Sequence, residues 1–444
     1  MRFRFIHAAD IHLGHAQYNL DQRADDFAAA YFEMVRYTIT AGADFLLLAG
    51  DLFHHARADA WTLKQAMAGL DQLRVAGIPV LAIEGNHDAQ HYFKNMSWME
   101  FLCDQELLVL LNMTTEANGY KSFLPFDPDT RRGGWIDIAG ARIYGLKWHG
   151  VATARILDEV SGQIEQGHGG YTAMMLHAGM QGQVPHLHGG LTPNQLAPLR
   201  PTIDYLALGH VHKRLRQDWI FNPGSTETNS IEEMDWAHGF FDVQVDTESD
   251  AKQDVQAVEI EGLRPFRRIS VTAAGKESLD EFVQCVEEHI AKAGTIPAGS
   301  VIELSLGGIA AFRRQDVPVD RLKEMVEARF RPLVVRLRND LVPPGVISGR
   351  NRERIPRAEL ERQIIERLVY QHVEYRDQAA VWTRLILDVK NMASEHNLPA
   401  SVADHVRQEL SKIQLAEPIV HPAPAPRPAT AGSASDALST GDEA

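Results

Sequence analysis

The first 246 residues alternate short apolar segments with amphipathic helical patterns, and this limits the folds open to this part of the chain. Apolar strand patterns are found at residues 2–7, 43–49, 78–83, 141–146, 171–176, 203–208 and 239–245. Apolar residues at helical spacing separate the first three strands, from Phe27 to Thr38 and from Leu63 to Leu73. The sequence therefore predicts an α/β domain.

Five short polar clusters directly follow predicted strands. They are Asp10-Ile11-His12, Gly50-Asp51, Gly85-Asn86-His87-Asp88, His177 and Gly209-His210-Val211-His212. Ligand sites in open α/β sheets form at the carboxyl ends of strands, where loops converge. A single histidine in such a place is more often a hydrogen-bonded structural residue. Five clusters in order, each with an oxygen or imidazole donor, indicate a metal centre instead.

The predicted donors suit two divalent ions. They are Asp10, His12, Asp51, Asn86, His177, His210 and His212. Oxygen and imidazole donors without a thiolate fit Mn²⁺, Fe or Zn²⁺ better than Ca²⁺ or a structural zinc finger. A two-metal site needs a bridging carboxylate, and Asp51 lies centrally in the order. We expect one ion on Asp10, His12, Asp51 and His212, and the other on Asp51, Asn86, His177 and His210.

Length and cysteine content set the broad class of protein. A chain of 444 residues is too long for one compact core, so two or three domains are expected. Cys103 and Cys285 cannot supply a disulfide framework, which fits a reducing compartment. No apolar run approaches the roughly 20 residues that cross a bilayer, and residues 1–10 do not form a secretory signal. We expect a cytoplasmic protein without a membrane role.

The sequence after residue 246 divides into four further parts. Residues 252–340 follow a β-α-β-α-β pattern, which predicts a small second domain. Residues 341–356 contain prolines, glycines and arginines and predict a linker. Residues 357–414 carry apolar stripes, among them Leu360, Ile364 and Leu385, that either pack on the second domain or dock helices of another chain. Residues 415–444 are rich in Pro, Ala and Ser and predict a disordered tail.

The motifs DxH, GD, GNHD, H and GHxH, in this order, resemble those of the calcineurin-like metallophosphoesterases. The surrounding segments HAADIHLGHAQYNL, LLAGDLFHHAR, VLAIEGNHDA, LALGHVHKR and NPGSTE are similar to the SbcD nucleases of double-strand-break repair, whose eukaryotic counterpart is the meiotic-recombination-eleven protein. The strong resemblance covers residues 1–246. It implies a sandwich of two central sheets flanked by helices, a small α+β DNA-capping domain and a C-terminal helical segment.

The resemblance also implies an activity and partners. Family members are Mn²⁺-dependent nucleases with two metal ions, for which Mg²⁺, Fe or Zn²⁺ are alternatives. They combine 3′–5′ exonuclease activity on double strands with endonuclease activity on single strands and hairpins. The helical segment corresponds to the place where they bind a coiled-coil ATPase of the SbcC type. The segments Trp61–Leu73 and Met96–Phe101 correspond to their homodimer interface, although Trp61 and Trp98 fit a core equally well.

The resemblance assigns His87 as the general acid. The residues agree, because His87 adjoins a predicted ligand but is surplus to two sites with four protein ligands each. His54 corresponds to the family position that orients this acid, where phosphatases of the wider superfamily carry Asp. Asp88 is expected in the second shell, holding an imidazole or capping a turn. In-line attack by an activated water, with His87 protonating the departing O3′, requires no protein nucleophile.

Net charge complicates the choice of substrate. The chain carries −15, and residues 1–246 hold 29 acidic against 18 basic side chains. A protein that binds DNA alone is usually basic. Arg57, Lys213 and Arg214 are the candidate contacts near the metal loops, and the resemblance assigns much of the DNA affinity to the assembly with the ATPase. Two alternatives stay open: a small-molecule phosphodiesterase or phosphatase of the same superfamily, and a non-catalytic scaffold subunit for a DNA-repair ATPase.

Overall fold

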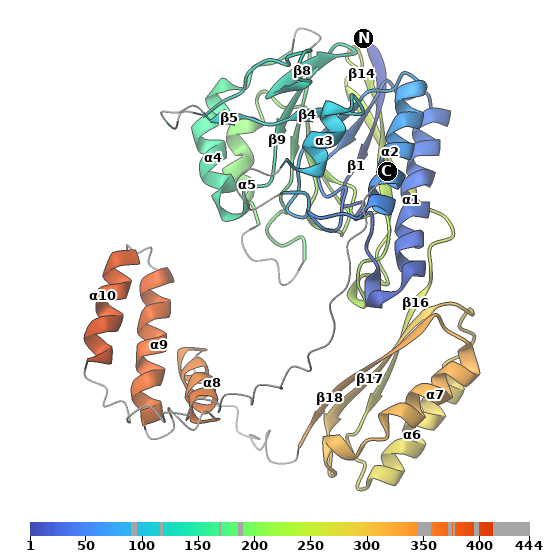
Figure 1. Cartoon of the computed structure of the whole chain (residues 1–444), viewed down its shortest axis with the longest axis vertical. Helices are drawn as coiled ribbons and strands as arrows, with labels where there is room; N and C mark the ends of the chain where they lie inside the picture. The colour runs from blue at the N-terminus through green and yellow to red at the C-terminus, as the bar shows by residue number, and fades with distance from the viewer. Residues whose placement is uncertain are drawn as a thin grey trace, which may run out of the picture. The chain divides into compact units, whose positions relative to one another are not determined.

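The computed structural model describes residues 1–89, 96–115, 119, 121–167, 170–184, 190–343, 357–371, 375, 378–394 and 399–411. The chain divides into two compact units, Met1–Val346 and Ile347–Ala444. Figure 1 shows the elements of each unit. Within the described residues, no helix is long and apolar enough to cross a membrane.

A seven-stranded sheet forms one layer of the first unit, in the order β15-β14-β1-β2-β3-β4-β7. Its strands are β1 (Arg2–Ala8), β2 (Phe45–Leu48), β3 (Val80–Ala82), β4 (Val109–Leu111), β7 (Arg132–Gly133), β14 (Gly239–Asp246) and β15 (Gln253–Glu259). Strands β1 to β4 are parallel, whereas β14 runs antiparallel to β1. The domain boundary predicted between residues 246 and 252 falls inside this sheet, because β15 begins at Gln253 and pairs with β14.

A second sheet of six strands forms the other layer, in the order β12-β13-β11-β10-β9-β8. Its strands are β8 (Trp135–Ile138), β9 (Ala141–Leu146), β10 (Tyr171–Leu176), β11 (Tyr205–Leu208), β12 (Leu215–Gln217) and β13 (Ile220–Asn222). The separate pair β5 (Thr114–Thr115) and β6 (Lys121–Ser122) forms a short hairpin. Side chains of both sheets, including Phe5, Phe45 and Tyr205, share one buried core. The core therefore lies between the two sheets.

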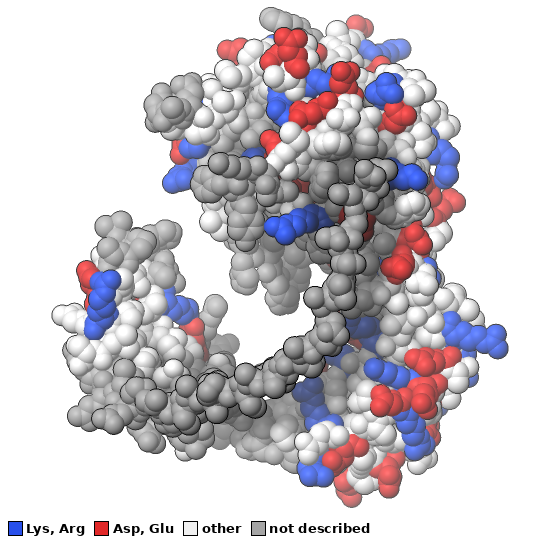
Figure 2. Space-filling view, in the orientation of Figure 1, with Lys and Arg blue, Asp and Glu red and all other residues white. Residues whose placement is uncertain are grey.

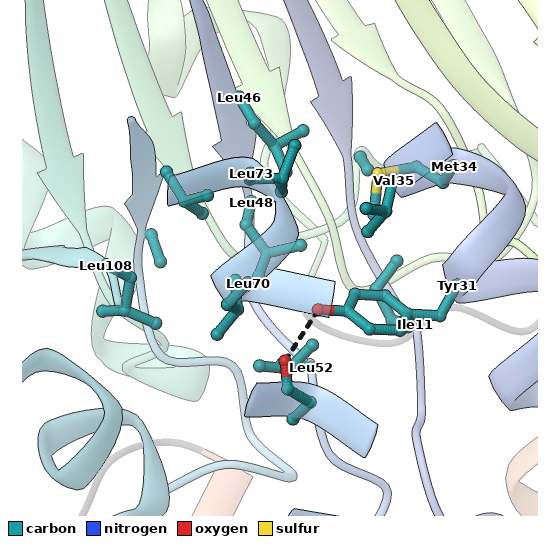
Figure 3. Packing of buried hydrophobic residues seen from close by; sticks show 14 of the residues in the cluster. Ile11, Tyr31, Met34, Val35, Leu46, Leu48, Leu52, Leu70, Leu73 and Leu108 are labelled. Atoms are coloured by element: carbon teal, nitrogen blue, oxygen red, sulfur yellow. Dashed lines mark hydrogen bonds between the residues drawn. The ribbon is translucent and has the colours of Figure 1, made fainter. Parts of the chain in front are cut away.

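Helices cover the outer faces of both sheets, and in Figure 1 helices α1 and α2 lie on one side of the strands and α4 and α5 on the other. The first sheet is covered by α1 (Asp21–Thr40), α2 (Ala60–Val75) and α3 (Trp98–Asp104), and the second by α4 (Thr153–Val160) and α5 (Pro193–Leu196). Figure 3 shows Tyr31 and Met34 of α1 near Leu46 and Leu48 of β2, and the Tyr31 hydroxyl donates to the Ala66 carbonyl at 3.0 Å. Because strands with two covered faces are apolar throughout, β2 reads as an unbroken apolar run. The predicted sandwich is confirmed.

The rest of the first unit is a smaller lobe of alternating strands and helices. It consists of β16 (Phe266–Thr272), α6 (Leu279–Lys292), β17 (Val301–Ile309), α7 (Val319–Phe330) and β18 (Val334–Val342), and its strands are all parallel. The apolar faces of both helices, which include Phe282 and Leu322, are buried in the core of this lobe. Short 3-10 helices occur at Gln17–Asn19, Gly150–Ala152, Ser161–Gln163, Ala197–Leu199, Ile231–Glu233 and Arg314–Asp316.

The described residues of the second unit form the helices α8 (Arg357–Gln371), α9 (Ala379–Ser394) and α10 (Pro399–Leu410). Helix α9 contacts both α8 and α10. Leu385 is buried, whereas Ile364 and Leu368 are 52% and 55% exposed. Of the predicted linker 341–356 only residues 341–343 are described, and the predicted tail 415–444 and the side chain of Leu360 lie outside the described residues.

Candidate metal centre

The polar clusters meet at one edge of the sandwich because β1, β2, β3, β10 and β11 all end there. The first two loops are joined through their backbones: the amide of Asp10 donates to the Gly50 carbonyl at 3.1 Å, and the amide of Ile11 donates to the Asp51 carbonyl at 2.9 Å. Asp10, Asp51 and His210 adopt positive φ angles of 53°, 55° and 82°. Such backbone strain persists where the surrounding structure enforces it, often at functional sites.

Two glycines of the motifs make room for this convergence. A Cβ atom at Gly50 would lie 2.3 Å from Nδ1 of His177, and one at Gly85 would lie 2.1 Å from Oδ1 of Asp51. Both positions therefore exclude any larger residue. The GD and GNHD motifs need glycine because donor side chains from neighbouring loops occupy that space.

All seven predicted donors lie together. Oδ2 of Asp51 is 3.2 Å from Nε2 of His177. Oδ1 of Asn86 is 3.1 Å from Nε2 of His177 and 2.8 Å from Nδ1 of His210. On the other side, His12 and His212 bring their Nε2 atoms within 3.1 Å of each other, and both have a nitrogen within 4.8 Å of a carboxylate oxygen of Asp10. The groups close enough to hold a metal ion are Asp10, His12 and His212, then Asp10, Asp51 and His177, and also His12, His54 and His87. The division of the seven donors between two ions stays a prediction.

Hydrogen bonds on the outer side of the rings set the orientation of the imidazoles. Nδ1 of His177 donates to the Ala49 carbonyl at 2.7 Å, and Nδ1 of His212 donates to Oε1 of Glu233 at 3.0 Å. In the neutral form of each ring, Nε2 then carries a lone pair that faces the other donors. Converging lone pairs from imidazole, carboxylate and amide groups repel one another unless a cation lies between them, so this donor set fits divalent metal ions.

His87 lies beside the donors but is held differently. Its amide donates to Oδ1 of Asp51 at 2.8 Å, and its Nδ1 donates to the backbone carbonyl of His54 at 2.7 Å. The ring centroids of His54 and His87 are 5.1 Å apart, and the ring planes are inclined by 24°. His54 thus contacts His87 through its carbonyl group and through stacking of the rings, while its Nδ1 lies 3.3 Å from Nδ1 of His12.

Asp88 fastens two metal loops to each other. Its carboxylate accepts hydrogen bonds from the amides of Asp51, Leu52, Phe53 and Gly85, at distances from 2.8 to 3.3 Å. The side chain is buried. Asp88 therefore lies behind the donors and fixes the backbone that carries Asp51 and Asn86.

Burial favours the neutral form of His12, His54 and His210, whereas nearby carboxylates raise the pKa of His177 and His212. Burial lowers the pKa of His54 to about 3 and that of His210 to about 4, and it holds the pKa of His12 well below its usual range. Burial also raises the pKa of Asp10 to about 6. For His177, burial is outweighed by the charge and hydrogen bond of Asp51, which raise its pKa to about 9. Neutral imidazoles are the form that binds a metal ion.

The three candidate DNA contacts differ in their surroundings. Arg57 and Lys213 are exposed. The Arg214 guanidinium instead turns into the domain, where Nε donates to the Pro223 carbonyl at 3.3 Å and Nη1 lies 3.5 Å from Oε1 of Glu259. Arg214 would have to break these contacts to bind a phosphate.

A cavity of about 230 Å³ opens beside the donors of the predicted second ion. It is lined by Asn86, Trp148, Gly150, Val151, Thr153, His177, Ala178, Gly179, Gly190 and His210. A substrate entering this cavity meets the metal donors directly.

Sequence reasoning missed Glu233, the partner of His212. It lies 21 residues after His212, in the 3-10 helix Ile231–Glu233, and no motif of the chain marks it. The preceding segment NPGSTE contributes to the family resemblance but does not indicate a role for Glu233.

The two-sheet sandwich and its oxygen and imidazole donors at one edge define a metal-dependent phosphoesterase, a hydrolase. Residues 3–214 match the family model of the calcineurin-like phosphoesterases, and this part of the chain is a calcineurin-like metallophosphoesterase domain. The family uses a dimetal centre, for which the converged donors are the candidates.

Curated relatives narrow the similarity further. The chain is 46% identical over 85 residues to the DNA double-strand break repair protein Mre11 of Archaeoglobus fulgidus, which covers 19% of each protein. It is 29% identical to the Mre11 protein of Haloferax volcanii over 64% of this chain and 58% of that protein. It is 28% identical to the uncharacterized metallophosphoesterase YhaO of Bacillus subtilis over 73% of this chain and 76% of that protein. The chain thus spans less than two thirds of the first two relatives.

Proposed function

We propose that this chain is a Mn²⁺-dependent DNA nuclease, the catalytic subunit of an SbcCD-like repair complex. The observation that carries the proposal is the convergence of seven donors beside His87, whose Nδ1 is held by the His54 carbonyl at 2.7 Å. The similarity to Mre11 proteins supports DNA as the substrate, because those relatives are named for repair of DNA double-strand breaks.

The donor set assigns each residue a task. Asp10, His12 and His212 would hold one ion and Asn86, His177 and His210 the other, with Asp51 shared between them. When bound, the two divalent ions would neutralise the phosphodiester and lower the pKa of water. Asp88 keeps the loops of Asp51 and Asn86 in register through four amide hydrogen bonds.

His87 would act as the general acid. In its protonated form, Nδ1–H donates to the His54 carbonyl and Nε2–H remains for the leaving O3′ of the scissile phosphate. Because the carbonyl fixes the ring, the proton is presented in one direction. His54 would act as a positioning residue through its carbonyl and its stacked ring.

The surface supports a nuclease that works within an assembly. On the face drawn in Figure 2, basic and acidic side chains are interspersed over the described residues. Several arginines of the smaller lobe are paired within the chain, such as Arg268 with Glu303 and Arg264 with Asp26. A coiled-coil ATPase of the SbcC type, bound through the α8–α10 unit, and a second copy of the chain, bound through α2, would add DNA contacts.

Hydrolysis of end-labelled linear duplex and hairpin DNA by the purified chain tests the proposal. The reactions contain Mn²⁺, Mg²⁺ or a chelator, and bis(p-nitrophenyl) phosphate serves as a parallel substrate. We expect Mn²⁺-dependent cleavage of DNA with 3′–5′ polarity on duplex ends. Cleavage of the analogue but not of DNA, even after addition of the ATPase, would favour a small-molecule phosphodiesterase. Cleavage of neither substrate would favour a scaffold subunit.

A further inference from the structure

His212 differs from the other metal-facing histidines in the group that orients it. His177 is oriented by the backbone carbonyl of Ala49, at 2.7 Å from Nδ1. His212 is oriented by a side chain, because its Nδ1 donates to Oε1 of Glu233 at 3.0 Å. A carboxylate partner fixes the tautomer and also makes the imidazole a stronger donor.

Glu233 is itself held in place before any metal arrives. Its side chain is buried, and its second oxygen, Oε2, accepts a hydrogen bond from the amide of Asn229 at 2.9 Å. The segment that carries Asn229 is held from the body of the domain, since Nη2 of the buried Arg23 donates to the Thr228 carbonyl at 2.8 Å and the side-chain amide of Gln17 donates to the carbonyl of Asn229. Both carboxylate oxygens of Glu233 are therefore engaged, one by His212 and the other by Asn229.

We propose that Glu233 is the positioning residue of the first metal ion, acting through His212. With Nδ1–H engaged by Glu233, the Nε2 lone pair of His212 points toward His12 and Asp10. Without the carboxylate, the ring loses its fixed tautomer and orientation. Among the described residues, the hydrogen bonds of the Glu233 carboxylate go to His212 and Asn229 and to none of the donors assigned to the second ion, so the second ion keeps its ligands.

Manganese binding, measured without any substrate, tests this role. The full chain is stripped with a chelator, and Mn²⁺ is titrated into it by calorimetry and by the electron paramagnetic resonance signal of free Mn²⁺. Unaltered protein is expected to bind two ions. Glu233→Ala should weaken one of them about 10- to 100-fold, the usual effect of removing an outer-shell partner. Glu233→Gln, which keeps a neutral acceptor of the same shape, should weaken it less.

Glu232→Gln is the matched control. Glu232 is the neighbouring carboxylate, but it is 58% exposed and pairs with Arg268 and Arg338 rather than with a histidine. This variant should bind both ions as the unaltered chain does. Circular dichroism and thermal unfolding of the metal-free proteins identify any variant that fails to fold. If Glu233→Ala does not fold, the Mn²⁺ affinity of Glu233→Gln decides the test.

A double-mutant cycle separates positioning from a general structural effect. If Glu233 acts through His212, Glu233→Ala should cause no further loss of Mn²⁺ affinity in a His212→Ala background. Unchanged affinity in folded Glu233→Ala, or full additivity in the cycle, would overturn the role of Glu233. The inference rests on the proposed metal centre, and failure of the unaltered chain to bind Mn²⁺ would overturn both.

Discussion

The histidines of the site differ in the group that their Nδ1 atom contacts. Backbone carbonyls hold His87 and His177, and a carboxylate holds His212. A carbonyl orients a ring without a charge, whereas a carboxylate also favours the protonated ring. Burial disfavours the charged form of His212, but the hydrogen bond to Glu233 and the nearby charges of Asp10 and Glu233 outweigh it, so the pKa of His212 is raised.

Replacing His87 tests the assignment of the acid. His87→Ala removes the proton donor but none of the seven metal donors, so kcat for DNA cleavage should fall about 10²- to 10⁴-fold while Mn²⁺ binding is retained. Single-turnover cleavage and a Mn²⁺ titration measure the two quantities. His55→Ala, a neighbouring exposed histidine, is the control and should cleave normally. Full activity in His87→Ala would rule out its role as the acid.

His7 makes the folded state sensitive to acid. It is buried, and its ring nitrogens contact the Tyr205 hydroxyl at 2.9 Å and the Leu208 carbonyl at 3.1 Å. Both nitrogens of the neutral ring therefore have a hydrogen-bond partner. Burial lowers the pKa of His7 from 6.5 to about 3. The unfolded chain therefore binds one more proton between these pH values. The stability that His7 contributes is complete above pH 6.5 and is lost as the pH falls below it, by about 1.4 kcal/mol per pH unit.

His7→Gln should reduce this pH dependence. We expect the pH slope of the free energy of unfolding between pH 4 and 6 to be smaller than in the unaltered chain by about 1.4 kcal/mol per pH unit. This difference corresponds to one proton fewer taken up on unfolding. Urea unfolding at several pH values measures the slope. His289→Gln, at an exposed position of α6, should leave it unchanged. An unaltered slope in His7→Gln would show that other groups govern the acid response.

At the scale of elements, a buried ion network joins α1 to the smaller lobe. Arg23 is fully buried, with Nη1 at 2.5 Å from Oδ2 of Asp26 and Nη2 at 3.3 Å from Oε1 of Glu227. Asp26 also pairs with Arg264, which precedes β16, and the Arg23 guanidinium lies 5.1 Å from the ring of Phe266 in β16. The entry to the lobe is thus tied to the first helix.

Removing Arg23 should be costly. Arg23→Met leaves Glu227 buried and without its cationic partner, so the free energy of unfolding should fall by about 3–5 kcal/mol. Arg36→Met, at a 73% exposed position of the same helix with a 3.8 Å ion pair to Glu33, should change it by less than about 1 kcal/mol. Denaturant unfolding compares the two variants. Equal stability of both would contradict a structural role for the network.

The sequence predicted strands β1, β2, β3, β9, β10, β11 and β14 and helices α1 and α2 of the sandwich, but not the short strands β4, β7, β8, β12 and β13. Strands β2 and β11 are continuous apolar runs, β10 is apolar apart from Thr172, and the helices carry regular apolar spacing. The edge strand β15 was missed because its Gln- and Asp-rich sequence resembles a linker, although its backbone pairs with β14. The metal donors follow strands and were predictable. Glu233 was not, because its contact with His212 depends on loop geometry that leaves no sequence pattern.

At the scale of the whole molecule, the proposed assembly depends on exposed apolar residues of α8. Ile364 and Leu368 are 52% and 55% exposed, whereas Leu385, a further candidate from the apolar stripes, is only 6% exposed. A charge at Leu385 would therefore disrupt the packing of the helices. Ile364 and Leu368 are the better positions for testing a docking surface.

Ile364→Asp combined with Leu368→Asp should abolish co-purification with the SbcC-type ATPase of the same cell and leave Mn²⁺ binding unchanged. In the complex the partner would bury both apolar side chains, and a carboxylate at either position would oppose this burial. Arg407→Asp, on the exposed surface of α10, controls for the charge change. Circular dichroism checks that the helices persist. Unimpaired co-purification would exclude this face of α8.

Dimer formation should depend on α2. Trp61 is 61% exposed beside an apolar hollow of about 450 Å³ that includes Leu63, Met67 and Leu107. A second copy would cover this surface. Trp61→Glu should therefore convert the chain to a monomer in sedimentation equilibrium, whereas Val151→Glu, at an exposed apolar position outside α2, should not. A Trp61→Glu protein with the mass of the unaltered protein would place the interface elsewhere.

The central claim is a two-metal centre built from donors at one edge of the sandwich. Anomalous diffraction at the manganese absorption edge, from crystals grown with Mn²⁺, tests it most directly. We predict two peaks about 3.5–4 Å apart with the Asp51 carboxylate between them, one beside His12 and His212 and the other beside His177 and His210. A single peak, or two peaks not bridged by Asp51, would contradict the account.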